Sequence, residues 1–422
     1  MNFRNFINFV FVCVGMALGG ASFSIPTPIF PSEALSRGVS VTQSGIVLGS
    51  AFLTTVIATP LCGKLIGWHG AKLVFVLGVL VCAVGNIAFG LLRYIQDPDA
   101  FFWLSLFFRI LTAVGESAIS PTAYPLGSQQ VSDRNQGKAI SVIECSFGIG
   151  MVAGPALGGF LYNLGGFAAP FWFLGVLLVL IVILTVFFFK LKPHTREEEE
   201  RSTSWRSLLS APGMKSNICG LLIAGSATNW YSAALEPYFV EKYELDAAEV
   251  GLLLMGFSIA YTVMAPIFGV IMDCGLTPIV AVLMGNLTIS LSMFLLGPFP
   301  GLTFLESVPI AALALVIHGV GTAAAFLATL LGMLESTKQG GIPHTDQTTG
   351  MVTSIWLMSL CTGAFLGDIT GGSVYDLAGF RWCCSIEGFV VGGLTLCLFS
   401  SALFSCHRRR HGYQQLGEST SL

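Results

Sequence analysis

The sequence predicts an all-α membrane protein with twelve transmembrane helices arranged as two pseudo-symmetric six-helix bundles. Three observations carry this prediction: the composition of the 422 residues, the length of the apolar runs and an internal repeat. Apolar side chains make up 54% of the chain and charged ones only 10%, whereas soluble domains average about 45–50% and about 25%. The apolar runs are continuous and about twenty residues long, which is typical of membrane helices and not of the alternating strands of a β-barrel.

Twelve apolar stretches have the length needed to cross a membrane as a helix. In chain order they span 6–30, 43–67, 73–95, 101–126, 137–163, 166–190, 216–240, 247–272, 278–297, 307–334, 349–374 and 380–404. The first stretch resembles a cleaved signal peptide, but it continues through Pro26 and Pro28, so we expect it to be retained.

One long hydrophilic segment divides the chain. It predicts an N-terminal six-helix bundle over 1–190, a cytoplasmic linker over 191–215 and a C-terminal six-helix bundle over 216–404. Residues 405–422 are expected to form a polar cytoplasmic tail.

The basic residues predict the orientation of these helices, because cytoplasmic segments are enriched in Lys and Arg. If the N-terminus is cytoplasmic, fifteen of the 20 Lys and Arg residues fall in cytoplasmic segments and four on the opposite side. The remaining one, Arg109, lies inside a helix. Both termini are therefore expected in the cytoplasm.

Composition also excludes several functions. A net charge of −3 offers no surface for nucleic acid. Most of the eleven cysteines fall inside apolar runs without CxxC or Cys/His spacing, so we expect no disulfide framework, metal site or cofactor. No nucleophile–base pair is apparent, and an enzyme is not expected.

The two halves repeat each other. Residues 150–167 match residues 363–380 at an offset of 213, with five identical glycines, a tyrosine and a phenylalanine. At an offset of 206, Gly45, Pro60 and Gly63 fall on Gly251, Pro266 and Gly269. Two parallel six-helix repeats are the architecture of transporters that bind the substrate between their halves.

Three motifs stand out against this repeat. The fifth stretch carries a glycine motif formed by Gly150, Gly154, Pro155, Gly158 and Gly159. The loop after the second stretch reads GKLIGWHGAK over residues 63–72 and contains Gly63, Gly67, Gly70 and Lys72; its second-half copy runs from Gly269 to Asp273. In the fourth stretch, Arg109 is followed by Gly115.

With these motifs the chain resembles the major facilitator superfamily over nearly its whole length. The resemblance implies a helix-packing role for the glycine motif, which is associated with proton-coupled antiporters, and a gating role for the two loops. The chain departs from the family at Gly67, where an Asp is usual, and at Ala71, where an Arg is usual; Asp273 keeps the acid in the second half.

A narrower resemblance points to the vesicular amine transporters, with the polyamine branch nearest. It rests on residues 30–34 (FPSEA), on Ile143-Glu144 before the glycine run and on Leu235-Glu236-Pro237. The first stretch carries no acidic residue, where monoamine carriers have an Asp. The resemblance implies a cationic amine as substrate.

Charges inside membrane helices are costly, so each one is a functional hypothesis. Five acids and one base qualify: Glu116, Glu144, Glu236, Asp368, Glu387 and Arg109. In the fourth stretch, Arg109, Thr112, Glu116 and Ser120 share one helix face. This polar stripe either faces a cavity and responds to protonation or is a charge network that only solvates itself.

Glu236 is predicted to receive an ammonium group. Asn229 and Ser232 lie on its helix face, and Pro237 frees a backbone carbonyl one turn earlier. The alternative is a hydrated Glu near the lumenal end of the helix. Glu144 lies off the glycine stripe and is expected to face a cavity, or else to bond a neighbouring helix.

For three further residues, the sequence is compatible with either a functional role or a role in helix packing. Asp368 stands where the repeat has Pro155, and it either joins the binding site or supports the glycine-rich turn. Glu387 is expected near the lumenal interface. His318, which the offsets place near the counterpart of Arg109, either takes part in proton coupling or is a packing residue.

The sequence thus predicts a proton-coupled antiporter of organic cations, monomeric and working by alternating access across a vesicle membrane. Carboxylates would hold either protons or the amine. The alternatives are a major-facilitator carrier of neutral compounds or organic anions, and a receptor that no longer transports. In the tail, Tyr413 and Leu416 resemble a signal read by clathrin adaptors, which favours endosomal, lysosomal or secretory vesicles over the plasma membrane.

Overall fold

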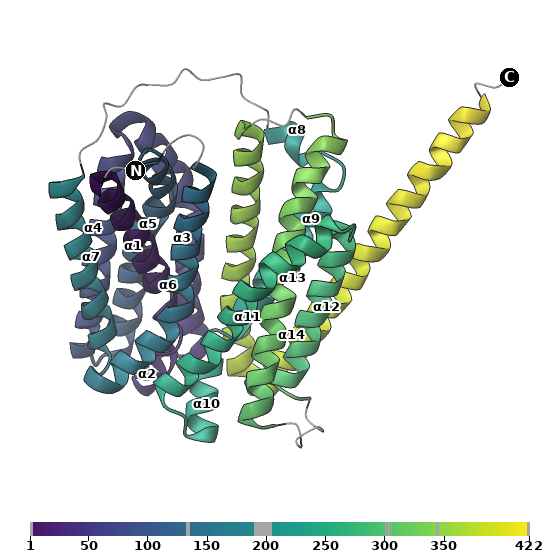
Figure 1. The fold of residues 1–422 in the computed structure, drawn as a ribbon. Coiled ribbons are helices and arrows are strands. Elements are labelled where there is room, and N and C mark those ends of the chain that lie inside the picture. The colour runs from purple at the N-terminus through teal and green to yellow at the C-terminus, as the bar shows by residue number, and fades with distance from the viewer. Residues whose placement is uncertain are drawn as a thin grey trace.

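The computed structural model describes residues 3–131, 136–189, 205–299, 301, 304, 306–342 and 346–419, and over them every regular element is a helix. Two bundles stand next to each other, α1 to α7 and α9 to α14 (Figure 1). The helices are α1 Phe3–Ser24, α2 Phe30–Ser36, α3 Val41–His69, α4 Ala71–Leu91, η1 Leu92–Tyr94, α5 Pro98–Ser128, α6 Gln136–Gly165, α7 Ala168–Phe188, α8 Trp205–Leu209, α9 Met214–Trp230, α10 Leu235–Tyr243, α11 Ala247–Asp273, α12 Pro278–Leu296, α13 Val308–Gln339 and α14 Asp346–Ser419.

Helices cover all twelve predicted stretches, and ten helices of the described part are long and apolar enough to cross a membrane. The last two stretches are joined in α14, which contains one non-helical residue, Gly379, with φ of 77°. A positive φ is accessible to glycine at little cost, so the chain turns back at this point. The first crossing is broken into α1 and α2, and the seventh crossing is broken into α9 and α10.

The sequence explains where helices begin and break. Ser40 and Asp246 each form a capping box, with Gln43 at the start of α3 and with Glu249 at the start of α11. These two caps are 206 residues apart, which is the offset of the repeat. The break after α1 contains Pro26 and Pro28, and proline cannot donate the backbone hydrogen bond that would continue a helix.

The glycine motif brings helices into close contact inside each bundle and between the bundles. A Cβ at Gly150 or Gly154 would collide with α1, and a Cβ at Gly159 would collide with Ala247 of α11. The second-half copy behaves alike, because Gly367 lies against Ser226 of α9 and Gly372 against Val41 of α3. Each motif therefore packs one helix on its own bundle and on the opposite bundle.

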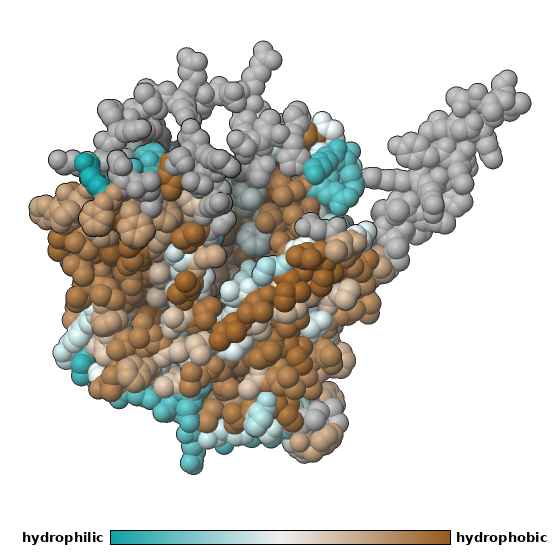
Figure 2. Space-filling view, in the orientation of Figure 1, coloured by the Kyte–Doolittle hydropathy of each residue, from teal (hydrophilic) through white to brown (hydrophobic). Residues whose placement is uncertain are grey.

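The two bundles meet at one face and separate towards the other. The chain termini mark what we call the terminal face, and α2 and α10 mark the far face (Figure 1). Contacts between bundles, such as Gly45 on Asp368 and Gly251 on Pro155, lie in the part of each helix nearer the far face. Towards the terminal face, Gly63 and Gly148 have no heavy atom near their missing side chains. Figure 2 shows the surface hollowed between the bundles on that side.

Two features of α14 add to the sequence-based expectation. Glu387, expected near an interface, is only 1% exposed inside the C-terminal bundle. The backbone of α14 remains helical through Ser419, so most of the segment expected to form a polar tail continues the last crossing as helix. No proline lies in residues 380–419, so every residue of this segment has the backbone N–H that a continuing helix needs.

Candidate functional site

A narrow cavity lies between the two bundles. Its lining is Phe23, Thr27, Leu48, Phe52 and Arg109 from the N-terminal bundle and Asn229, Ser232 and Asp368 from the C-terminal bundle. The cavity has a volume of about 30 Å³, and a water molecule needs roughly 10–15 Å³ by the same measure. It therefore has room for about two waters in this conformation, and it lies next to the breaks in the first and seventh crossings.

Asp368 is the acidic group of this lining. Asp368 is 1% exposed, and its Oδ1 accepts a hydrogen bond from the Ser232 hydroxyl. Its Oδ2 has no partner among the residues that the structure describes. The rings of Phe23 and Phe52 lie edge to face with centroids 4.9 Å apart. A carboxylate oxygen without a donor, beside aromatic faces, suits an ammonium group that donates hydrogen bonds and favours ring faces.

Arg109 is held by the break in the first crossing. Its Nη2 donates to the Phe23 carbonyl at 3.0 Å and its Nη1 to the Ser22 carbonyl at 3.4 Å. The Ser22 carbonyl is free because its helical partner would be the nitrogen of Pro26, which carries no hydrogen. Proline in the sequence thus creates the acceptor that fixes the guanidinium.

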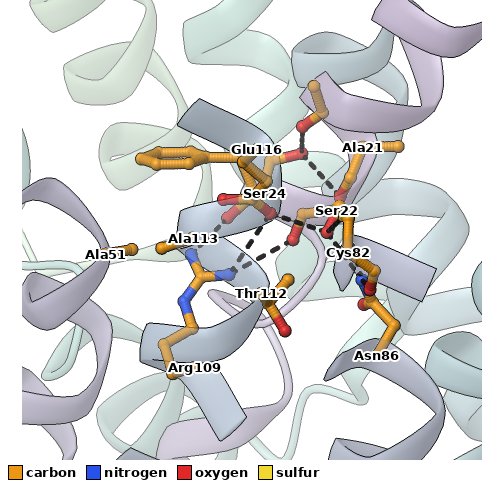
Figure 3. A network of polar contacts seen from close by, with 12 residues as sticks. Ala21, Ser22, Ser24, Ala51, Cys82, Asn86, Arg109, Thr112, Ala113 and Glu116 are labelled. Atoms are coloured by element: carbon orange, nitrogen blue, oxygen red, sulfur yellow. Dashed lines mark hydrogen bonds and ion pairs between the residues drawn. The ribbon is translucent and has the colours of Figure 1, made fainter. Parts of the chain in front are cut away.

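Glu116 balances the charge of Arg109 within the same helix. Oε1 of Glu116 lies 3.7 Å from Nη1 of Arg109 and accepts the Ser22 hydroxyl at 2.6 Å. Asn86 donates in turn to the Ser22 oxygen at 2.8 Å, so the network joins α1, α4 and α5 (Figure 3). The carboxylate neutralises the guanidinium, which leaves Asp368 as the uncompensated charge of the cavity.

The structure thus brings together five of the residues singled out from sequence, namely Arg109, Glu116, Asn229, Ser232 and Asp368. Asn229 donates to the Gly225 carbonyl at 3.1 Å and lines the cavity. Sequence reasoning missed Ser22 and Asn86. The repeat offset of 206 offered a signal, because it pairs Ser22 with Thr228 and Asn86 with Ser292, both polar.

Glu144 and Glu236, like Glu387, lie outside the cavity lining. Glu144 is exposed and accepts the Tyr124 hydroxyl. Glu236 is 3% exposed, and its Oε2 accepts the backbone N–H of Ser32 at 2.6 Å. Since Ser32 belongs to α2 and Glu236 to α10, this hydrogen bond joins the two bundles at the far face.

His318 is buried inside the C-terminal bundle. Its Nδ1 lies 2.9 Å from the Ser292 hydroxyl, and the rings of Tyr231 and Phe257 lie 5.4 Å and 5.6 Å from its ring. Nε2 has no partner. At the offset of 206, His318 corresponds to Thr112, whereas Arg109 corresponds to Leu315.

The loop motifs lie at the terminal ends of α3 and α11. Gly70 has φ of 80° and turns the chain from α3 into α4, and Lys72 donates to the Phe189 carbonyl at the end of α7. A side chain at Gly63 would meet nothing, and one at Gly269 would touch Leu327. The side chain of Asp273 and the surroundings of Gly67 lie outside the described residues.

Two polar contacts close the far face in addition to Glu236. Asp376 of α14 accepts the backbone N–H of Thr42 at 2.8 Å and the Thr42 hydroxyl at 2.6 Å. Asn163 of α6 donates to Asp246 of α11 at 2.9 Å. Asn163 and Asp376 are 213 residues apart, which is the offset of the repeat. Equivalent positions near the far face therefore bond the start of a helix in the opposite bundle.

We expect replacement of Glu236 to weaken closure of the far face. Glu236→Ala removes the acceptor for the Ser32 amide and should abolish transport, whereas Glu236→Gln retains an acceptor oxygen and should keep part of it. Initial uptake rates of both variants in proteoliposomes measure the difference. Equal, complete loss in both would instead assign the charge of Glu236 to substrate or proton binding.

Comparison with known proteins places this geometry in a family. The Major Facilitator Superfamily profile matches residues 12–229 and 217–419. The MFS-type transporter SLC18B1 of Mus musculus is 29% identical over 399 residues, covering 92% of this chain and 85% of the relative. The synaptic vesicular amine transporter of Bos taurus is 24% identical, covering 89% of this chain and 68% of the relative.

A solved structure shares the fold. It is a bacterial homologue of the human lysosomal transporter Spinster in an inward-facing, occupied conformation, with a TM-score of 0.76 and 14% sequence identity. The alignment covers 95% of this chain and 97% of that chain. At this identity the likeness concerns the arrangement of the helices.

Proposed function

The chain belongs to the major facilitator superfamily, and from this membership and the geometry of the cavity we propose that it is a proton-coupled antiporter of organic cations. The proposed substrates are amines, polyamines among them, and the proposed setting is a vesicle membrane. The observation that carries the proposal is Asp368, whose buried Oδ2 lacks a donor in a cavity that both bundles line.

The charge balance of the cavity supports a cation over an anion. An anion carrier needs an unpaired positive group, and the guanidinium of Arg109 is already matched by Glu116. Within the part of the chain that the structure describes, Asp368 has no such counter-ion within hydrogen-bonding distance. The relatives named as vesicular amine transporters agree with this chemistry.

Alternating access follows from the way the bundles meet. In this conformation the far face is closed by Glu236, Asp376 and Asn163, and the bundles separate towards the terminal face. We assign the terminal face to the cytoplasm, because the basic residues concentrate there. The conformation then opens the cavity to the cytoplasm, and rocking of the bundles would expose it to the lumen.

Transport by the purified protein tests the proposal. The full chain is reconstituted in proteoliposomes with an acidic interior and offered radiolabelled monoamines, polyamines and organic anions. We expect accumulation of one or more amines that stops when an ionophore collapses the pH gradient. Accumulation of anions only, or no transport of any compound by the folded protein, would contradict the proposal.

The tail motif gives a prediction about location. Tyr413→Ala should move a tagged protein from intracellular vesicles to the plasma membrane, because adaptors bind this kind of signal through its aromatic and aliphatic anchors. Fluorescence microscopy with surface biotinylation measures the shift, and Gln415→Ala is the matched control. The α14 backbone is helical here, so binding in an extended form requires local unwinding. An unchanged distribution of Tyr413→Ala would remove the signal from the proposal.

A further inference from the structure

The two repeats build the same interhelical hydrogen bond from different chemistry. In the N-terminal bundle, the Ser22 hydroxyl of α1 donates to Glu116 of α5 at 2.6 Å. In the C-terminal bundle, the hydroxyls of Thr228 in α9 and Thr322 in α13 lie 3.3 Å apart. Both pairs are related by the offset of 206, so Glu116 occupies the position that Thr322 occupies in the other half.

The neutral copy shows which part of this arrangement the fold needs. A threonine pair is enough to join the two helices in the C-terminal bundle, and Leu315 stands there at the position of Arg109. Charges inside membrane helices are expensive, so an ion pair that helix packing does not require indicates a function. The N-terminal bundle therefore carries Glu116 and Arg109 for a purpose other than packing.

Few charged or titratable groups surround Glu116. Arg109 lies two turns earlier on the same face of α5, and α4 contributes the Cys82 thiol, which is next to the Ser22 hydroxyl. Helix α1 contributes Ser22, and α3 meets α5 near this level through Thr55 and Ser117. On α6, Glu144 is bonded to Tyr124 two turns further along α5.

Arg109 connects Glu116 to the cavity. Its guanidinium is bonded to Glu116 on one side and lines the cavity together with Asp368 on the other. Oε2 of Glu116 and Oδ2 of Asp368 are both buried without a partner. One cation thus pairs with Glu116 and lines the same cavity as Asp368, and each carboxylate has an oxygen without a partner among the described residues.

We propose that Glu116 carries the exchanged proton and that Arg109 passes the resulting change of charge to Asp368. This inference rests on the proposed function. When Glu116 is ionised it neutralises Arg109, and Asp368 is free to bind the ammonium group. When Glu116 takes up a proton, Arg109 loses its counter-ion and pairs with Asp368, which displaces the amine. One proton enters the site as one ammonium charge leaves it.

Binding measurements on the intact protein test this inference. The full chain in lipid nanodiscs is titrated with a radiolabelled amine that the transport panel identifies, at acidic and at neutral pH. Wild-type affinity should fall as the pH falls. Glu116→Gln mimics the protonated acid and should bind about tenfold more weakly at both pH values, a typical size for coupling between sites.

A double variant separates charge coupling from structural damage. Arg109→Gln combined with Glu116→Gln removes the competing guanidinium, so it should recover affinity and lose the pH dependence. Glu116→Thr, which copies the pair found in the other half, should match Glu116→Gln. Thr322→Val is the control in the neutral repeat and should bind the amine as wild type does, with the same pH dependence.

The outcomes separate this inference from the proposed function. If wild type binds and exchanges amines while Glu116→Gln keeps wild-type affinity and pH dependence, the inference is wrong and the antiporter remains. If the double variant binds as weakly as Glu116→Gln, Arg109 does not transmit the charge, and the inference is equally wrong. If the folded wild type binds no amine, the proposed function is wrong, and the inference that rests on it is wrong as well.

Discussion

Asp368→Asn should abolish amine transport while the protein still folds. The amide keeps the shape of the carboxylate and still offers Oδ1 to the Ser232 hydroxyl, so the local packing is retained. What is lost is the negative charge of the cavity. Removing one partner of a buried charge pair costs about 2–5 kcal/mol, which corresponds to a loss of affinity of about 30-fold to several thousandfold.

Initial rates of amine uptake in proteoliposomes measure this effect, with thermal unfolding as the test of folding. Glu335→Gln is a matched control, because it removes the charge of an exposed carboxylate on α13 outside the cavity lining. Uptake by Asp368→Asn at more than half the wild-type rate would show that the ammonium group binds elsewhere.

Gly154→Leu should stop turnover. A Cβ at this position already collides with Ser24 of α1, and leucine adds three more carbon atoms to the same contact. Overpacking of a close helix contact typically costs about 1–3 kcal/mol through shifted backbone. The shift would fall on the end of α1, beside the break whose carbonyls hold Arg109, so binding and turnover should fail together.

Gly148→Leu on the same helix is the control, because nothing lies near its missing side chain. Gly367→Leu tests the second copy, where the glycine lies against Ser226 of α9. Uptake and binding by purified variants measure the outcome. If Gly154→Leu transports at the wild-type rate, or if Gly148→Leu is equally inactive, close approach of α6 to α1 is not what turnover requires.

The general architecture could be predicted from the sequence because its causes are local. Continuous apolar runs of membrane length fix the crossings, and the repeat offsets fix which helices are equivalent. The stripe of Arg109 and Glu116 was also predictable, since a spacing of seven residues places both on one helix face. The breaks before α2 and α10 were only partly predictable. Proline marks where a helix is interrupted, but it does not set the direction of the helix that follows.

The sequence by itself determined that this protein crosses a membrane in two equivalent halves and that its internal charges are few. The tertiary structure decided which of those charges meet. Arg109 and Asp368 are 259 positions apart and share a cavity only because the two bundles dock at the far face. Glu236 is on the same crossing as Asn229, yet the break before α10 turns it to the Ser32 amide of the opposite bundle and away from the cavity. Helical spacing sets the face of a side chain within one helix, whereas a contact between helices depends on how the bundles pack.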